Sequence, residues 1–156
     1  MLKRYLVRMG IAILVFMSLA GCAGGGNLFG EPAPTEIPFA RFTSQDVLNA
    51  FSTAGITIEV IQREMLIGRD APSTFIDRYT FQVPRIAPSG GQLLIFENEA
   101  GLAEWENYIS RLRADVATRR DVSYVYINSN ALVQVNANLT PPEANQFRDA
   151  VASLGN

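Results

Sequence analysis

A stretch rich in glycine and proline, residues 23–40, limits what this chain can fold into. It holds four glycines, which allow many coil conformations, and three prolines, which favour extended structure. We therefore interpret residues 22–40 as a tether that begins at Cys22. Residues 41–156 remain for folding, and they are enough for one domain but too few for two. We expect them to form a single α/β domain.

The residues before the tether, 1–21, have the pattern of an export signal. Its basic residues are Lys3, Arg4 and Arg8. An apolar run, residues 11–17, follows them and leads into small residues. A basic head, an apolar middle of about 7–15 residues and a small-residue exit are typical of a secretory signal peptide. The uncharged stretch between Arg8 and Cys22 is too short for a transmembrane helix, which needs about 18 residues or more.

The end of this segment reads Leu19-Ala20-Gly21-Cys22, which resembles the lipobox of bacterial lipoproteins. The resemblance implies that a lipid is attached to the Cys22 sulfur and that the chain is cut between Gly21 and Cys22. The membrane would then be a partner through lipidated Cys22, and the protein would face outside the cytoplasm on the cell membrane or the outer membrane. Ala23 is not the aspartate associated with inner-membrane retention, which favours the outer membrane. The alternative is an ordinary secretory signal followed by a chance cysteine.

Composition excludes several function classes. The chain has one cysteine and no histidine, which rules out a disulfide within the chain, a histidine triad and a His/Cys zinc site. Without residues 1–21, 13 − 3 = 10 basic residues, all arginine, face 15 acidic ones, a formal charge of −5. An acidic chain without a basic stripe argues against nucleic acid as a partner. We expect no cofactor and no metal.

Catalytic motifs are absent from the sequence. It has no glycine-rich phosphate loop, no Gly-x-Ser-x-Gly and no His-Glu-x-x-His, and its hydroxyls lack a histidine or lysine base beyond residue 21. Acidic pairs suited to acid–base catalysis are Asp70 with Asp77 and Glu97 with Glu99, but so many acidic residues produce such pairs by chance. We assign no catalytic residue and expect a non-catalytic binding or accessory module that meets an envelope protein or polymer. The alternative is a carboxylate-dependent envelope glycan hydrolase, which needs two acidic residues about 5–10 Å apart in a cleft.

Hydrophobic periodicity predicts the first half of the domain. Thr43 and Asp46 have capping-box spacing and begin a helix that Gly55 ends. Residues 56–61 alternate and predict a half-buried strand, with a short helix over residues 62–66 as an alternative continuation. Residues 75–83 and 92–96 predict two strands that pair as a hairpin around the turn at residues 87–91.

The second half begins with the longest expected helix, which Asn98 caps. Its apolar stripe is Leu102, Trp105, Ile109, Leu112 and Val116. Residues 121–127 and 131–138 predict a second hairpin around residues 128–130. Thr140, Pro141 and Glu143 begin a last helix. Its buried stripe is expected to be Ala144, Phe147, Ala150, Val151 and Leu154.

The predicted order is α-β-β-β-α-β-β-α, which indicates an α+β fold. We expect a two-layer sandwich with a mostly antiparallel sheet of about five strands and with the helices on one face. Together with the segments 94–97 and 131–135, each leading into a helix, this order resembles small lipid-anchored α/β domains of bacterial envelopes. No function is established for those domains, so the resemblance implies no site residue.

One surface patch is a candidate for binding. Tyr124 and Tyr126 share a strand face, and Arg119 and Arg120 lie near its edge. Tyrosine and arginine are favoured at interfaces, so an open tyrosine face would be a binding patch. The alternative is a sheet whose tyrosine face is covered by helices. Trp105 lies in the apolar stripe of its helix, and we expect it in the core.

Overall fold

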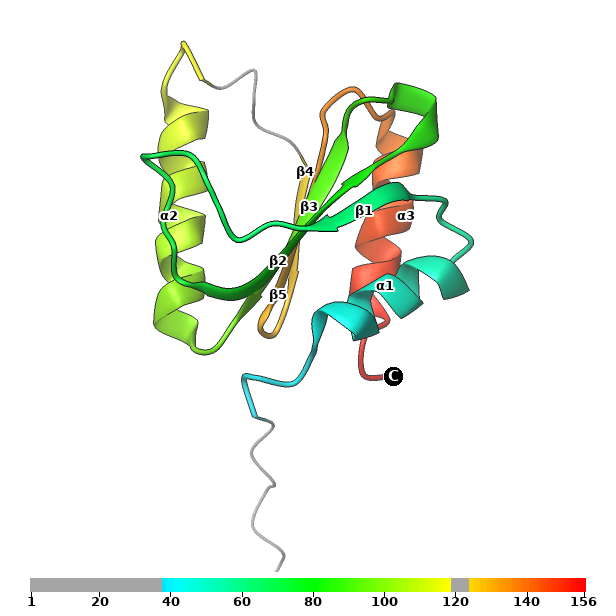
Figure 1. Ribbon diagram of the computed structural model, residues 1–156, viewed down its shortest axis with the longest axis horizontal. Helices are drawn as coiled ribbons and strands as arrows, with labels where there is room; N and C mark the ends of the chain where they lie inside the picture. The colour runs from blue at the N-terminus through cyan, green and yellow to red at the C-terminus, as the bar shows by residue number, and fades with distance from the viewer. Residues whose placement is uncertain (1–37, 119–123) are drawn as a thin grey trace, which may run out of the picture. The chain divides into compact units, whose positions relative to one another are not determined.

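Five antiparallel strands form one sheet in the spatial order β1-β2-β3-β5-β4 (Figure 1). The computed structural model describes residues 38–118 and 124–156. The strands are β1 (Glu59–Arg63), β2 (Phe75–Gln82), β3 (Gly90–Phe96), β4 (Tyr124–Asn128) and β5 (Ala131–Val135). The helices are α1 (Ser44–Thr53), α2 (Glu99–Ala114) and α3 (Pro141–Ala152), and a short 3-10 turn η1 (Pro84–Ile86) joins β2 to β3. The predicted α+β class, antiparallel sheet and order of elements are confirmed.

The helices cover both faces of the sheet, which corrects the prediction of a two-layer sandwich with helices on one face. α1 and α3 pack on the face that carries Leu93 and Ile95, and α2 packs on the face that carries Leu94 and Phe96 (Figure 1). All four of these residues of β3 are buried. Because side chains alternate along a strand, such a continuous apolar run must be covered from both sides.

The predicted starts of α1 and α3 are confirmed. The Thr43 backbone N–H donates to the Asp46 carboxylate at 2.7 Å, and the Asp46 N–H donates back to the Thr43 hydroxyl. A capping box also lies at the start of α3, where the Thr140 N–H donates to the Glu143 carboxylate at 2.8 Å. Gly55, at φ +70°, follows the end of α1. The predicted α3 stripe is also confirmed, since all five of its residues are buried.

The first strand differs from the prediction. β1 starts at Glu59 rather than at Ile56, all five of its residues are exposed, and no helix follows it over residues 62–66. Ile56 enters the core before the strand begins. Val60 has a positive φ of 49°, and the pairing register with β2 shifts between Glu59 and Gln62. This bulge interrupts the alternation that the sequence suggested, so the half-buried strand was a wrong prediction.

Two boundaries in the second half also differ. α2 begins after Asn98, whose side chain accepts the Gly101 N–H at 3.0 Å, but it ends at Ala114. Val116 is therefore not part of the stripe and is 72% exposed. In the second hairpin, Asn128 pairs with Ala131, so the predicted turn narrows to two residues. Residues 121–123 of the predicted strand lie outside the described residues. No helix within 38–118 or 124–156 is long and apolar enough to cross a membrane.

Candidate functional site

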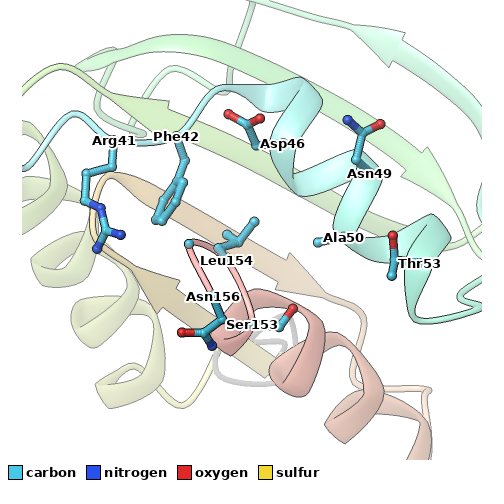
Figure 2. Close-up of a pocket in the computed structure, with 10 residues that line it drawn as sticks. Arg41, Phe42, Asp46, Asn49, Ala50, Thr53, Ser153, Leu154 and Asn156 are labelled. Carbon is cyan, nitrogen blue, oxygen red and sulfur yellow. The ribbon is translucent and has the colours of Figure 1, made fainter.

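An open groove lies between α1 and the end of α3, with a volume of about 610 Å³ (Figure 2). Its polar side chains are largely occupied by local hydrogen bonds. Asp46 caps α1, the Ser153 hydroxyl donates to the Ala150 carbonyl, and the Asn156 amide donates to the Ala152 carbonyl. Arg41 stacks over Phe42 at 4.9 Å. The groove therefore offers few free groups with which to recognise a ligand.

Two smaller hollows lie on the sheet face that α2 covers only in part. Thr80, Gln92 and Gln134 are register partners on three adjacent strands, so their side chains form one polar row. Arg78 precedes Thr80 by two residues and shares its face. Two hollows, of about 250 and 180 Å³, share Arg78, Gln92 and Gln134 as lining residues. We call their union the polar crevice.

The remaining lining of the polar crevice comes from two sources. The sheet contributes Thr80, Gly90, Gly91 and Asn136. The loop after β1 and the helix α2 contribute Ile67, Gly68, Ala71, Trp105, Tyr108, Ile109 and Leu112. The crevice thus runs from a polar sheet surface to the space between α2 and the sheet.

Hydrogen bonds hold the polar row in place. Arg78 Nε donates to Gln92 Oε1 at 2.8 Å, and Gln92 Nε2 donates to Gln134 Oε1 at 2.8 Å. Arg78 Nη1 donates to the carbonyls of Glu64 and Leu66 at 3.1 and 2.7 Å. The Arg78 side chain is only 13% exposed. The guanidinium is therefore fixed in the floor of the crevice before any ligand arrives.

Arg78 supplies the charge of the crevice. Burial lowers the pKa of Arg78, and the nearby Glu64 carboxylate, 3.6 Å from Nη1, acts in the opposite direction. A guanidinium stays protonated in proteins, so Arg78 is a half-buried cation. No carboxylate lies among the residues that line the polar crevice. The crevice is electropositive and only partly balanced by Glu64 at its side.

Trp105, which lines the half of the crevice beneath α2, carries an unpartnered polar group. The residue is 2% exposed and packs edge-on against Phe75 and Tyr108, with centroid distances of 6.2 and 5.5 Å. Its indole Nε1 is buried and has no hydrogen-bond partner among the described residues. A buried donor without a partner costs about 1–3 kcal/mol. Trp105 is a core residue, as predicted, but its N–H is an unused donor.

Gly90 keeps the sheet surface open at the crevice, because it shares the strand face of Gln92. A Cβ at Gly90 would lie 1.9 Å from the Phe81 carbonyl oxygen, so this position accepts no side chain without backbone movement. No side chain from this position covers the sheet surface beside Thr80 and Asn136.

The structure describes only part of the predicted tyrosine patch. Tyr124 and Tyr126 are half-buried and pack against the core that α1 and α3 form on the sheet. Burial raises the pKa of Tyr126. Arg119 and Arg120 lie outside the described residues, as do Gly21 and Cys22. The patch as a whole stays a prediction, and the half-burial of its tyrosines gives it little free surface.

The candidate acidic pairs have other roles or none. Asp77 accepts hydrogen bonds from the Ser44 hydroxyl at 2.6 Å and from Arg63 Nε at 2.7 Å, which ties β2 to α1 and β1. Glu97 and Glu99 are exposed. The groove of Figure 2 is lined by one acidic side chain, Asp46, and the polar crevice by none. A separate hollow of about 370 Å³ is also lined by one acidic side chain, Glu143.

Sequence reasoning missed the polar crevice. Its signal was the presence of polar residues inside strands that were interpreted for their apolar residues alone: Arg78 and Thr80 at alternating positions of β2, Gln92 in β3 and Gln134 in β5. Within the described part of the chain, no three acidic, histidine or cysteine side chains gather as metal ligands would. Comparisons of the chain with protein-family models, with curated proteins and with solved structures found no match.

Proposed function

We propose that this protein is a lipid-anchored lipoprotein of the cell envelope whose single domain is a non-catalytic binding or accessory module. The observation that carries the proposal is Leu19-Ala20-Gly21-Cys22, placed directly after a basic head and an apolar run. Cys22 is the only cysteine, so no disulfide competes for its sulfur within the chain. One acyl chain holds a protein only marginally, so we expect Cys22 to be multiply acylated.

The polar crevice supports binding as the role of the domain. It combines a fixed cation, amide groups and an unused indole donor, which are groups that orient a ligand. Its lining lacks the two facing carboxylates that glycoside hydrolysis needs, and Arg78 does not exchange its proton near neutral pH. Recognition without turnover is the chemistry that fits these residues.

The tether sets the distance at which this module can lie from the membrane. Residues 23–37 lie between Cys22 and the first described residue, Pro38. Such a segment spans tens of ångströms if extended, at about 3 Å per residue. The domain would then meet partners beyond the membrane surface, in the envelope space outside the cytoplasm.

Cell fractionation tests the anchor. The full-length protein should label with radioactive palmitate and pellet with membranes, and Cys22→Ala should do neither. Ala23→Ser, next to the attachment site, is the matched control and should behave as the wild type. A Cys22→Ala protein that still incorporates label and pellets would refute lipidation at Cys22.

Crosslinking in intact cells tests the accessory role. The anchored protein and its Cys22→Ala form would be crosslinked in parallel and analysed by mass spectrometry. We expect at least one envelope protein or glycan fragment that is recovered reproducibly with the anchored form and is depleted with the variant. Equal recovery with both forms would contradict a role that depends on anchoring.

A further inference from the structure

We propose that the polar crevice binds the carboxylate group of a small ligand, with the Arg78 guanidinium as its cationic partner and the Trp105 indole N–H as a neighbouring donor. This inference rests on the proposed binding function and names the ligand class of that module. Arg78, Gln92 and Gln134 belong to both halves of the crevice, and Trp105 belongs to the half beneath α2.

Arg78 is prepared for such a contact. Its Nε and Nη1 atoms are used to fix the side chain, and Nη2 makes no hydrogen bond to residues 38–118 or 124–156. Hydrogen bonds between a guanidinium and a carboxylate are stronger than neutral ones, and burial strengthens them further. Because the side chain is already ordered, binding loses little rotamer freedom.

Charge favours a single carboxylate over a doubly charged phosphate. Arg78 is the one cation that lines the crevice, and the half-exposed Glu64 carboxylate, 3.6 Å from its Nη1 atom, already offsets part of its charge. A carboxylate adds one negative charge beside Arg78, whereas a doubly charged phosphate adds two, which is more costly in a partly buried site. The amides of Gln92 and Gln134 suit neutral polar groups of the same ligand.

The size of the crevice limits the rest of the ligand. Its two hollows measure about 250 and 180 Å³, each below the range of about 300–1,000 Å³ for ligand pockets. The ligand is therefore small, such as an amino acid, a dipeptide end or one uronic acid ring. The shared chemistry is a carboxylate with adjacent hydrogen-bonding groups, and its source is either a peptide terminus or an acidic sugar.

Trp105 makes the proposal measurable, because it is the only tryptophan in the chain. The experiment uses residues 22–156 with Cys22→Ala, which keeps every described residue. Two acids, N-acetyl-alanyl-alanine and glucuronate, would be titrated against their neutral counterparts, N-acetyl-alanyl-alanine amide and glucose. The readouts are the indole N–H resonance and the tryptophan emission. We expect one acid to move both signals and its neutral counterpart to bind about tenfold more weakly or worse.

Variants identify the crevice as the site. Arg78→Gln removes the charge and should weaken binding of the acid about tenfold or more, while Arg78→Lys should restore part of it. Arg148→Gln, on the exposed surface of α3, is the matched control and should leave binding unchanged. If Arg78→Gln does not fold, Gln134→Glu tests the same point, because a carboxylate in the crevice should repel the ligand.

Three results would overturn the proposal: no response to either acid, equal response to acid and neutral compounds, or unchanged binding by folded Arg78→Gln. N-acetyl-alanyl-alanine alone as the active acid would identify a peptide terminus, and glucuronate alone an acidic sugar. These measurements do not involve the anchor. A Cys22→Ala protein that stays in the membrane would therefore refute the lipoprotein assignment without changing the titration.

Discussion

Asn130 shows how one side chain holds several segments of the domain together. It lies in the β4–β5 turn and is 1% exposed. Its Oδ1 accepts the N–H groups of Arg41 and Phe42 at 3.1 and 2.9 Å, and its Nδ2 donates to the carbonyls of Phe42 and Phe96 at 2.9 and 3.3 Å. The Asn130 side-chain amide thus fixes residues 41 and 42, just before α1, to the sheet.

We predict that Asn130→Ala lowers the free energy of unfolding by about 3 kcal/mol, because several buried backbone groups lose their partner. Urea denaturation of residues 22–156 with Cys22→Ala would measure the change. Asn107→Ala, on the exposed side of α2, is the control and should stay within about 0.5 kcal/mol of the parent. A loss below about 1 kcal/mol for Asn130→Ala would contradict the role of this amide.

Asp77 makes stability depend on pH. Burial raises the pKa of its carboxyl, but hydrogen bonds from Ser44 and Arg63 and the charge of Arg63 outweigh burial, and the pKa lies below its usual value. A carboxyl with a lowered folded pKa stabilises the fold above its unfolded pKa of about 3.9, and that contribution disappears as the pH falls through the folded value.

We therefore expect Asp77→Asn to be less stable than the parent at pH 7, by about 1 kcal/mol given the exposure of Arg63. The difference should shrink as the pH falls below about 4. Urea unfolding midpoints of the parent and the variant at pH 7 and at about pH 3 measure this stability difference. Glu106→Gln, on the outer side of α2, is the control. A difference that is the same at both pH values would show that charge on Asp77 does not matter.

At the scale of elements, helix starts were the easiest features to predict. Thr43, Asn98 and Thr140 begin α1, α2 and α3 because capping depends on a few adjacent residues. Positions set by tertiary contacts were harder. Ile56 belongs to the core although β1 begins only at Glu59, and nothing local marks the bulge at Val60.

The sequence also did not predict which face of the sheet α2 covers, because this too depends on tertiary contacts. The apolar run in β3 fits a strand covered on both faces, but periodicity does not say which helix covers which face. The polar crevice was harder still, because Arg78, Gln92 and Trp105 come from different elements. Their proximity depends on strand register and on where α2 crosses the sheet, and neither is encoded in a short motif.

We predict that Leu94→Ala costs about 2–5 kcal/mol of stability, because Leu94 is fully buried between β3 and α2. Ile127 lies in the same register row as Leu94, because both pair with Leu132, but it is 39% exposed, and Ile127→Ala should cost less than half as much. Thermal or urea unfolding of the two variants gives the comparison. Equal losses would mean that α2 does not cover this face.

For the whole molecule, the net charge opposes attachment to anionic membranes, so attachment would depend on the lipid anchor that we propose at Cys22. The chain from residue 22 has a formal charge of −5, from 10 arginines and 15 acidic residues. An acidic protein is repelled by anionic lipid surfaces. Exposed apolar side chains lie in β1 and the loop after it, where Leu66 is 82% exposed and is preceded by the exposed Val60, Ile61 and Met65, while Val116, at 72%, lies after α2. We expect these side chains to be too few to hold the domain on a membrane.

We therefore expect residues 22–156 with Cys22→Ala to stay in the supernatant when phosphatidylglycerol vesicles are sedimented, even at low salt, where attraction to a basic patch would be strongest. The acylated protein purified from membranes should sediment with phosphatidylglycerol and with neutral phosphatidylcholine vesicles alike, because acyl burial does not depend on lipid charge.

Co-sedimentation of the unacylated chain with phosphatidylglycerol alone would reveal an attraction that the net charge does not explain. Its co-sedimentation with both lipids would assign membrane binding to the domain's own apolar residues, and Leu66→Asp would then be expected to release it.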